Sequence, residues 1–171
     1  KPEEAAEREE FLNFTKDVKD EIERLNNIVS DFLQLAQPSS QQSEIVNVSD
    51  LVEDLLRLLE SESLSRNVEI KSAVDSNLSL TRWNKVEAKS ALLNVAMNAL
   101  QAMEANGGKL NIEAKSDSHW IVLKFSDTGP GIKEEDLSQV LLTYVTRRKG
   151  GTGLGLSIAR RVTERYGGKL T

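Results

Sequence analysis

The stretch DTGPGIKEEDLSQVLLTYVTRRKGGTGLG, residues 127–155, decides most of what can be inferred from this chain. It holds a first glycine turn at residues 127–131 and a second glycine turn at residues 150–155, separated by a polar segment. All ten glycines of the chain lie between Gly107 and Gly168, and six of them lie in this stretch. Glycine costs backbone entropy in regular elements, so such a cluster indicates positive φ angles or the close approach of another group. We expect that group to be a phosphate ester.

The second glycine turn leads into a predicted helix at residues 156–164. Helix N-termini bind anions because their first N–H groups lack intrahelical acceptors and lie at the positive end of the helix dipole. The basic residues at 147–149 add cationic partners for a phosphate. The Gly-x-Gly-x-Gly spacing is a weak signal by itself, since tight turns before helices look the same, and it matches neither a P-loop nor a Rossmann fingerprint.

The composition excludes several classes of protein. With 27 acidic and 22 basic residues among 171, the chain has a net charge of −5, which disfavours nucleic-acid binding. It contains no Cys, so neither a disulfide framework nor a thiolate metal site is possible. No apolar run approaches the roughly 18 residues of a membrane span, and no signal peptide opens the chain. We therefore expect a soluble, cytoplasmic protein.

Residues 1–37 form the first predicted unit, a long amphipathic helix. Apolar side chains recur with a heptad spacing, Phe11, Val18, Leu25 and Phe32 in one seam and Phe14, Ile28 and Leu35 in a second. A helix of about 34 residues would be roughly 50 Å long, which a compact domain of this size cannot cover. Either the stripe packs on its own domain or, as we prefer, the helix projects and buries residues 4–36 against a second copy or another chain.

Pro38 and the polar residues after it predict a linker over residues 38–44, followed by one domain over residues 45–171. The periodicity of that domain predicts, in order, a strand at 45–48, a helix capped by Ser49 or Asp50 that fades at 61–67, strands at 68–71 and 78–80, a helix at 85–105, strands at 109–115 and 120–125, a turn of helix at 134–140, the helix at 156–164 and the start of a strand at 169–171.

Three polar residues in these elements are candidates for ligand contact. Asn94 and Asn98 stand four residues apart, so their side chains emerge on one side of the helix, one turn apart. Asparagine is a poor helix former and its amide needs partners, so the pair either binds a ligand or forms ordinary surface or capping amides. Asp127 follows directly from a predicted strand, and we expect a carboxylate at a buried edge that accepts a hydrogen bond from a ligand amine.

Taken in order, these motifs resemble the GHKL ATPases. Residues 94–99 look like the N box of that family and residues 127–132 like its first glycine box. Residues 151–158 look like the second glycine box in the form found in bacterial sensor histidine kinases. Residues 4–37 look like the second helix of the dimerisation and phosphotransfer domain of those kinases, which is a less specific likeness.

The resemblance implies an α/β (α+β) two-layer sandwich, with helices packed on one face of a mixed β-sheet, preceded by the long helix. It implies ATP and Mg²⁺ as cofactors. Asn98 would coordinate Mg²⁺, Asn94 would assist at the phosphates, and Asp127 would receive the adenine amino group. Residues 132–150 would form a flexible lid. The implied nucleotide contacts are Asn94, Asn98, Asp127, Gly129, Gly131, Ile132, Tyr144, Thr146, Arg148, Gly151, Thr152, Gly153, Leu154 and Gly155.

The sequence departs from the family pattern at several positions. Leu141 and Tyr144 stand where the family usually has Phe, and Gln101 replaces a basic residue seen in many members. Arg148 stands where a phosphate-contacting Lys is common. The phosphoacceptor His with its acidic neighbour is absent, and the single histidine, His119, falls at a predicted hairpin edge.

The function that this resemblance implies is the ATP-binding catalytic part of a sensor histidine kinase, in the cytoplasm either as a soluble protein or as the cytoplasmic part of a membrane-bound sensor. It would transfer the γ-phosphoryl group of ATP to a histidine outside this chain, for relay to an Asp of a response regulator receiver domain. Two alternatives stay open. One is a GHKL ATPase or a serine kinase of the anti-sigma type, and the other is a non-catalytic, nucleotide-regulated interaction module.

Overall fold

Three strands form the sheet on which the helices of this protein pack. They are β2 (Val68–Val74), β4 (Gly108–Ser116) and β5 (Ile121–Asp127), in the order β2-β4-β5. β2 pairs with β4 in parallel and β5 pairs with β4 in antiparallel, so the sheet is mixed, as predicted. Side chains alternate along β4, where Leu110, Ile112 and Ala114 are buried and their neighbours are not.

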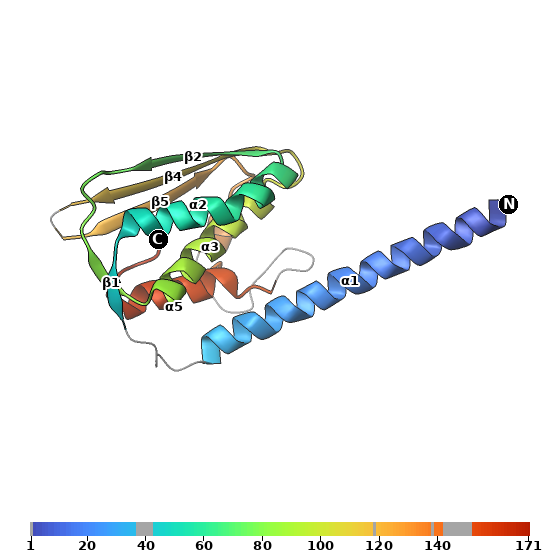
Figure 1. Ribbon diagram of the computed structural model, residues 1–171, viewed down its shortest axis with the longest axis horizontal. Helices are drawn as coiled ribbons and strands as arrows, with labels where there is room; N and C mark the ends of the chain where they lie inside the picture. The colour runs from blue at the N-terminus through green and yellow to red at the C-terminus, as the bar shows by residue number, and fades with distance from the viewer. Residues whose placement is uncertain (1, 37–42, 118, 138, 142–151) are drawn as a thin grey trace.

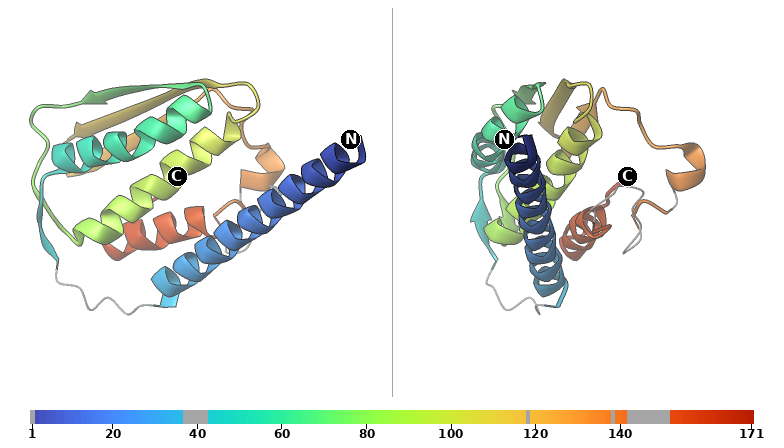
Figure 2. Two further views of the ribbon diagram at one scale, coloured as in Figure 1. Left: turned by 45° about the vertical axis from the view of Figure 1, so that its right-hand side comes forward. Right: turned by 90° about the vertical axis from the view of Figure 1, so that its right-hand side faces the viewer.

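Two helices cover one face of this sheet, and a third lies beside them. α2 (Val48–Ser65) and α3 (Lys85–Ala102) pack on the strands, and α5 (Gly155–Arg165) packs against α3 (Figures 1 and 2). This computed structural model describes residues 2–36, 43–117, 119–137, 139–141 and 152–171. The expected two-layer arrangement is confirmed. The core between the layers is aliphatic, with Val52, Leu55, Leu59, Leu100, Met103, Leu110 and Ile112 among its buried side chains.

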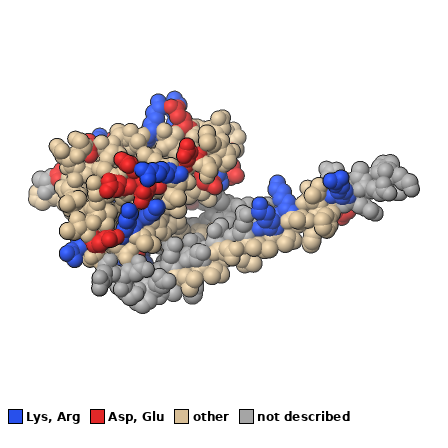
Figure 3. Space-filling view, in the orientation of Figure 1, with Lys and Arg blue, Asp and Glu red and all other residues tan. Residues whose placement is uncertain are grey.

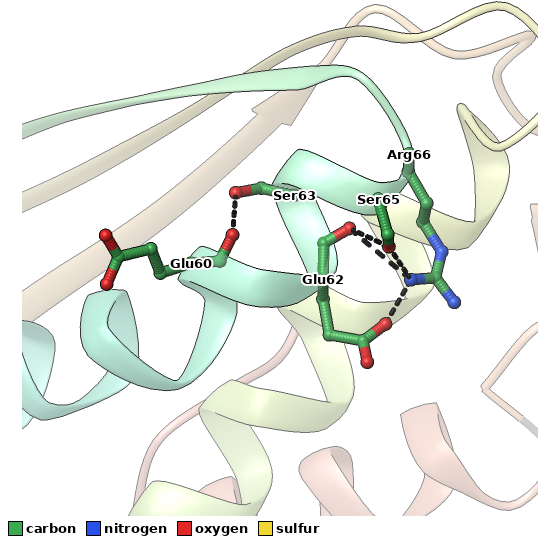
Figure 4. Close-up of polar contacts among 5 residues, drawn as sticks. All are labelled: Glu60, Glu62, Ser63, Ser65 and Arg66. Atoms are coloured by element: carbon green, nitrogen blue, oxygen red, sulfur yellow. Dashed lines mark hydrogen bonds and ion pairs between the residues drawn. The ribbon is translucent and has the colours of Figure 1, made fainter.

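The ends of α2 differ from the prediction. Asn47, rather than Ser49 or Asp50, is the N-cap, and its side chain accepts a hydrogen bond from the N–H of Ser49 at 3.0 Å. The helix does not fade at residue 61 but continues to Ser65. Its last turn is stabilised by Ser63 and Ser65, whose hydroxyls donate to the carbonyls of Glu60 and Glu62, and by an ion pair of Arg66 with Glu62 (Figure 4).

A two-stranded antiparallel sheet joins β1 (Glu44–Val46) to β3 (Thr81–Trp83). The strand predicted at 78–80 is therefore wrong by three residues, since Thr81–Trp83 pairs with β1 instead. Residues 169–171, predicted to begin a strand, are not in a strand, because they do not join either ladder. The short helix α4 (Glu134–Leu137) falls where a turn of helix was predicted.

The long helix α1 (Pro2–Ala36) projects from the rest of the molecule (Figure 1). Where it approaches the domain, its neighbour is α5 (Figure 2). Most described side chains of its apolar stripe are exposed, with Phe11 at 67% and Phe14 at 64%, whereas Ile28 is half-buried. The side chains of Phe32 and Leu35, and most of the predicted linker, lie outside the described residues. At most of the described positions the stripe therefore does not pack on its own domain.

Charges are mixed on the face of the domain that Figure 3 shows, where Lys and Arg side chains lie beside Asp and Glu side chains. This face has no concentrated basic surface, in agreement with the net charge of −5. Among the described residues, no helix is both long enough and apolar enough to cross a membrane.

Candidate functional site

Helix α3 lies at the centre of the candidate site. It begins at the N-cap Asn84, whose side chain accepts a hydrogen bond from the N–H of Glu87 at 3.0 Å. Two ion pairs join its first turns to α2, from Lys85 and Lys89 to Asp54 at 3.3 and 3.5 Å. The hydrogen bond from Lys85, followed by the charges of both lysines, holds the pKa of Asp54 below its usual value. These contacts fix α3 against the helix that precedes it in the chain.

Asn94 and Asn98 are half-buried in the middle of α3. A Cβ atom added to Gly155 would lie 3.2 Å from Oδ1 of Asn94, so the start of α5 passes directly over this side chain. The second glycine turn and the asparagine pair, more than fifty residues apart in the sequence, are therefore neighbours. Asn98 lies one turn further along the same helix.

The first glycine turn begins at Asp127, the last residue of β5. Oδ1 of Asp127 accepts a hydrogen bond from the N–H of Gly129 at 2.9 Å, which closes the turn. Since a carboxylate has two oxygens, Oδ2 can still accept a hydrogen bond from a ligand. The side chain is exposed rather than at a buried edge, because β5 ends here at the border of the sheet.

Thr128 ties this turn to the sheet, a role that the sequence analysis missed. Its N–H donates to the carbonyl of Lys109 at 3.1 Å, and its Oγ1 accepts from the N–H of Lys109 at 3.0 Å. The same hydroxyl contacts Sδ of Met103 at 3.6 Å. The side chain thus extends the β4–β5 ladder by one pair beyond its last strand residue. No pattern in the sequence indicates this, since it depends on the register of two strands and the end of a helix.

Gly129 brings the first glycine turn against the end of α3. A Cβ atom here would lie 2.9 Å from Oδ1 of Asp127 and 3.2 Å from Cβ of Ala102, so any larger residue would push the turn away. Gly131 follows with a φ of 73°, and Ile132 after it is 48% exposed. The first glycine turn therefore lies at the C-terminal end of α3, whereas Asn94 and Gly155 lie at its middle.

The described part of the second glycine turn is held by its own side chains. Thr152 Oγ1 accepts a hydrogen bond from the N–H of Leu154 at 3.3 Å, and Gly153 has a φ of 68°. Leu154 is buried, and its carbonyl accepts a hydrogen bond from Ser157 Oγ at 2.8 Å. Leu154 thus fixes the first turn of α5 in the core, while Thr152 and Gly153 before it are half-buried.

Four predicted site residues lie outside the described part of the chain: Tyr144, Thr146, Arg148 and Gly151. Most of the predicted lid, residues 132–150, lies there as well. Tyr144 and Arg148 are also two of the positions at which the sequence departs from the family pattern. His119 is described, and it lies in the turn between β4 and β5, where its N–H donates to Oδ1 of Asp117 at 2.8 Å.

The residues present fit a bound nucleotide and a divalent cation in two respects. The amide oxygen of Asn94 points at a glycine whose missing side chain leaves room beside it, and Asn98 provides a second amide oxygen one turn away. Neutral oxygen ligands suit Mg²⁺ when phosphates supply the charge. Among the described residues, no cluster of three or more His, Cys, Asp or Glu side chains could hold a metal by itself. A cation here would therefore depend on the phosphates of its nucleotide.

Comparisons with known proteins agree with this geometry. Residues 84–171 match the family model described as histidine kinase-, DNA gyrase B-, and HSP90-like ATPase. Sporulation kinase D of Bacillus subtilis is 34% identical over 154 residues, which are 90% of this chain and 30% of that protein. The sensor histidine kinase ZraS of Salmonella typhimurium is 29% identical over 151 residues, 88% of this chain and 32% of its own length. The chain thus spans about a third of the length of these curated relatives.

One solved structure shows the same fold over most of the chain. The full-length ShkA structure in complex with AMPPNP has a TM-score of 0.75 and 24% sequence identity, and the match covers 94% of this chain and 34% of ShkA. The match includes most of the chain, so it reaches beyond the 88 residues of the family model. With its fold, its ordered motifs and its relatives in agreement, the chain belongs to the family of histidine kinase-, DNA gyrase B- and HSP90-like ATPases.

Proposed function

We propose that this chain is the ATP-binding catalytic portion of a sensor histidine kinase. The observation that carries the proposal is the contact of α3 with both glycine turns, with Ala102 beside Gly129 and Asn94 beside Gly155. One helix thus aligns a base-binding carboxylate, Asp127, with a phosphate-binding helix N-terminus. The adenine amino group would donate to Asp127, and the phosphates would accept from the N–H groups of the second glycine turn.

Magnesium would be held by Asn98 together with phosphate oxygens, and Asn94 would contact the phosphates from one turn earlier. When bound, Mg²⁺ neutralises the charge that develops on the phosphates during transfer. The residues of this chain then orient the nucleotide and keep its γ-phosphoryl group exposed to an acceptor. Tyr144, Thr146, Arg148 and Gly151 belong to the proposed nucleotide contacts, as do Gly131, Ile132, Thr152, Gly153 and Leu154.

The phosphoryl acceptor would be a histidine outside this chain. His119 is unsuited to the role, because it lies at the opposite end of β5 from Asp127, roughly 20 Å away along a seven-residue strand. In the transfer, the bond between the γ-phosphorus and its bridging oxygen breaks, a phosphorus–nitrogen bond forms on the acceptor imidazole, and ADP leaves. We propose that an Asp of a response regulator receiver domain then takes the phosphoryl group.

Two features support this choice of reaction and partner. The relatives at 34% and 29% identity are a sporulation kinase and a sensor histidine kinase by name. The exposed stripe of α1 is suited to a helix bundle, and we propose that residues 4–36 pair there with a second copy of the chain or another helix. We propose that the reaction takes place in the cytoplasm, where ATP and receiver domains are available.

Binding of a fluorescent ATP analogue, with and without Mg²⁺, tests the nucleotide site first. Incubation with labelled ATP and an isolated histidine-bearing acceptor domain from a relative then tests the reaction. We expect a phosphorylated acceptor that loses its label in acid and keeps it in alkali. Acid-stable label on a serine would instead indicate a kinase of the anti-sigma type. Tight nucleotide binding with no transfer to any acceptor would indicate a nucleotide-regulated interaction module.

A further inference from the structure

Tyr166 directly follows α5 and reaches the opposite end of the helix pair from the glycine turns. Its hydroxyl donates to Oε2 of Glu87 at 2.9 Å and accepts from the backbone N–H of Asn84 at 2.9 Å. Asn84 is the N-cap of α3 and Glu87 lies in its first turn, so one hydroxyl connects the end of α5 to the start of α3. Arg165, the last residue of α5, also contacts the carboxylate of Glu87. We call Asn84, Glu87, Arg165 and Tyr166 the Tyr166 cluster.

This cluster is partly shielded from water. Asn84 is 4% exposed, and the side chains of Glu87 and Arg165 are about a quarter exposed. The Tyr166 ring lies 6.2 Å from the ring of Trp83, tilted at 47°, which closes one side of the cluster. Burial, the first cause, and the carboxylate of Glu87 raise the pKa of the Tyr166 hydroxyl, so the hydroxyl stays protonated near neutral pH and can donate to Glu87.

Because of its position at the end of α5, the cluster can determine where the second glycine turn lies. α5 runs for eleven residues from Gly155 to Arg165, or about 16 Å, and a helix is stiff over that length. Its first residue lies over Asn94, and the residue after its last lies on Asn84. A tilt of about 5° around the cluster would move the far end by about 1.4 Å, which is enough to spoil the alignment of a bound phosphate.

We propose that Tyr166 is a positioning residue for the phosphates of the nucleotide. Through Asn84 and Glu87 it sets the position of α5 along and across α3, and so it places the second glycine turn against Asn94. The inference rests on the proposed function, because it takes the phosphates to lie at that turn. It adds residues that lie 10 to 71 positions from Gly155 in the sequence and that no glycine-box motif includes.

The test uses the whole chain and two ligands that differ only in their phosphates. Binding of ATP with Mg²⁺ and binding of adenosine are measured for the parent protein and for Tyr166→Phe. We expect ATP to bind about 5- to 10-fold more weakly to the variant, less than for a lost direct contact because the hydrogen bond to Glu87 acts on the phosphates only through the position of α5, and adenosine to bind within about twofold of the parent. Glu87→Ala, which removes the acceptor from the other helix, should give the same selective loss.

Glu164→Gln is the matched control. It removes a charge two residues before Tyr166, where Glu164 pairs only with Arg160 of the same helix at 2.7 Å in the described contacts, and it should leave both affinities unchanged. A Tyr166→Phe variant that binds ATP like the parent, or that loses ATP and adenosine equally, would overturn the proposal.

Hydrogen exchange separates failure of this inference from failure of the proposed function. In the nucleotide-free protein, backbone N–H groups of residues 158–161, the first that are hydrogen-bonded within α5, should exchange about 5-fold faster in Tyr166→Phe than in the parent, while those of α2 keep their rates. Unchanged exchange there would refute the role of Tyr166 even if the parent binds ATP. Faster exchange in Tyr166→Phe, together with a parent protein that does not bind ATP, would confirm the mechanical coupling and refute the phosphate assignment on which the proposal depends.

Discussion

The two glycine turns look alike in sequence, but the structure holds them in different ways. The first is fixed locally, by Asp127 within the turn, by Thr128 on β4 and by the close approach of Gly129 to α3. The second starts a helix whose other end is tied to α3 by the Tyr166 cluster. The contacts of the first turn lie within or next to it, so they resist its displacement directly. The second turn is at the start of α5 and can shift when that helix shifts. We therefore expect the base-binding end of the site to be the more rigid one.

Replacing Asp127 with Asn should have the largest effect on binding. The new amide can still accept from the N–H of Gly129, but it presents a donor or a neutral acceptor where the adenine amine approaches. Losing a hydrogen bond to a charged group costs about 1.5–3 kcal/mol, so ATP and adenosine should both bind about 10- to 100-fold more weakly.

Fluorescence titration or calorimetry with both ligands measures this effect. Asp117→Asn is the control, because Asp117 also accepts backbone hydrogen bonds in a turn, from His119 and Trp120, at the other end of β5. An Asp127→Asn variant that binds as tightly as the parent would remove the adenine assignment.

Gly155→Ala tests the second turn and should show the next largest effect. Its Cβ would lie 3.2 Å from Oδ1 of Asn94, so either that amide or the start of α5 must move by a few tenths of an ångström. We expect ATP binding to weaken about tenfold, since misplaced phosphate contacts lose about 1.4 kcal/mol, while adenosine binding stays within about twofold. An equal loss of affinity for ATP and adenosine would contradict the proposal that the first turn binds the base and the second turn binds the phosphates.

Thr128→Val should have a smaller effect, on the first turn only. The valine keeps the shape of threonine but leaves the N–H of Lys109 without the hydroxyl that accepts its hydrogen bond. One such bond contributes about 1 kcal/mol, so both ligands should bind about 3- to 5-fold more weakly and the free energy of unfolding should fall by about 1 kcal/mol. Thr128→Ser keeps the hydroxyl and should restore most of both losses, as urea unfolding and titration can show.

Leu25→Glu on α1 should have the smallest effect on nucleotide binding and a large effect on association through α1. Leu25 is 54% exposed on the stripe and belongs to neither glycine turn, so nucleotide affinity should stay within about twofold of the parent. If residues 4–36 form a helix bundle, a buried charge at a seam position should dissociate it. Light scattering across a concentration series measures this. Lys19→Glu, on the opposite face, is the control, and equal association of Leu25→Glu and the parent would contradict the bundle.

Local patterns in the sequence were enough to predict most elements of the domain. Alternation in 109–115 and 120–125 predicted the hairpin of β4 and β5, and the apolar face at Leu51, Leu55 and Leu59 predicted α2. The prediction was wrong where the stabilising contact involves side chains that no periodicity reports. Ser63 and Ser65 extend α2 through bonds to carbonyls, and Asn47 caps it in place of Ser49 or Asp50.

The pairing between strands that lie far apart in the chain could also not be predicted from the sequence. Residues 78–80 alternate like a strand, yet Thr81–Trp83 is the segment that pairs with Glu44–Val46. β1 and β3 lie nearly forty residues apart in the sequence. Their register depends on how the intervening α2 packs, not on the local pattern.

By itself, the sequence was enough to name the candidate residues of the proposed site, because the spacing of two asparagines and the composition of two glycine turns are local properties. It also determined that α1 and α2 are amphipathic, since a helical stripe is a property of one segment. Only the tertiary structure decided that the stripe of α2 is buried and the described stripe of α1 is exposed, because burial depends on which surface lies opposite. It likewise decided the roles of Thr128 and Tyr166, whose hydroxyls act on residues that meet them only when strands and helices pack.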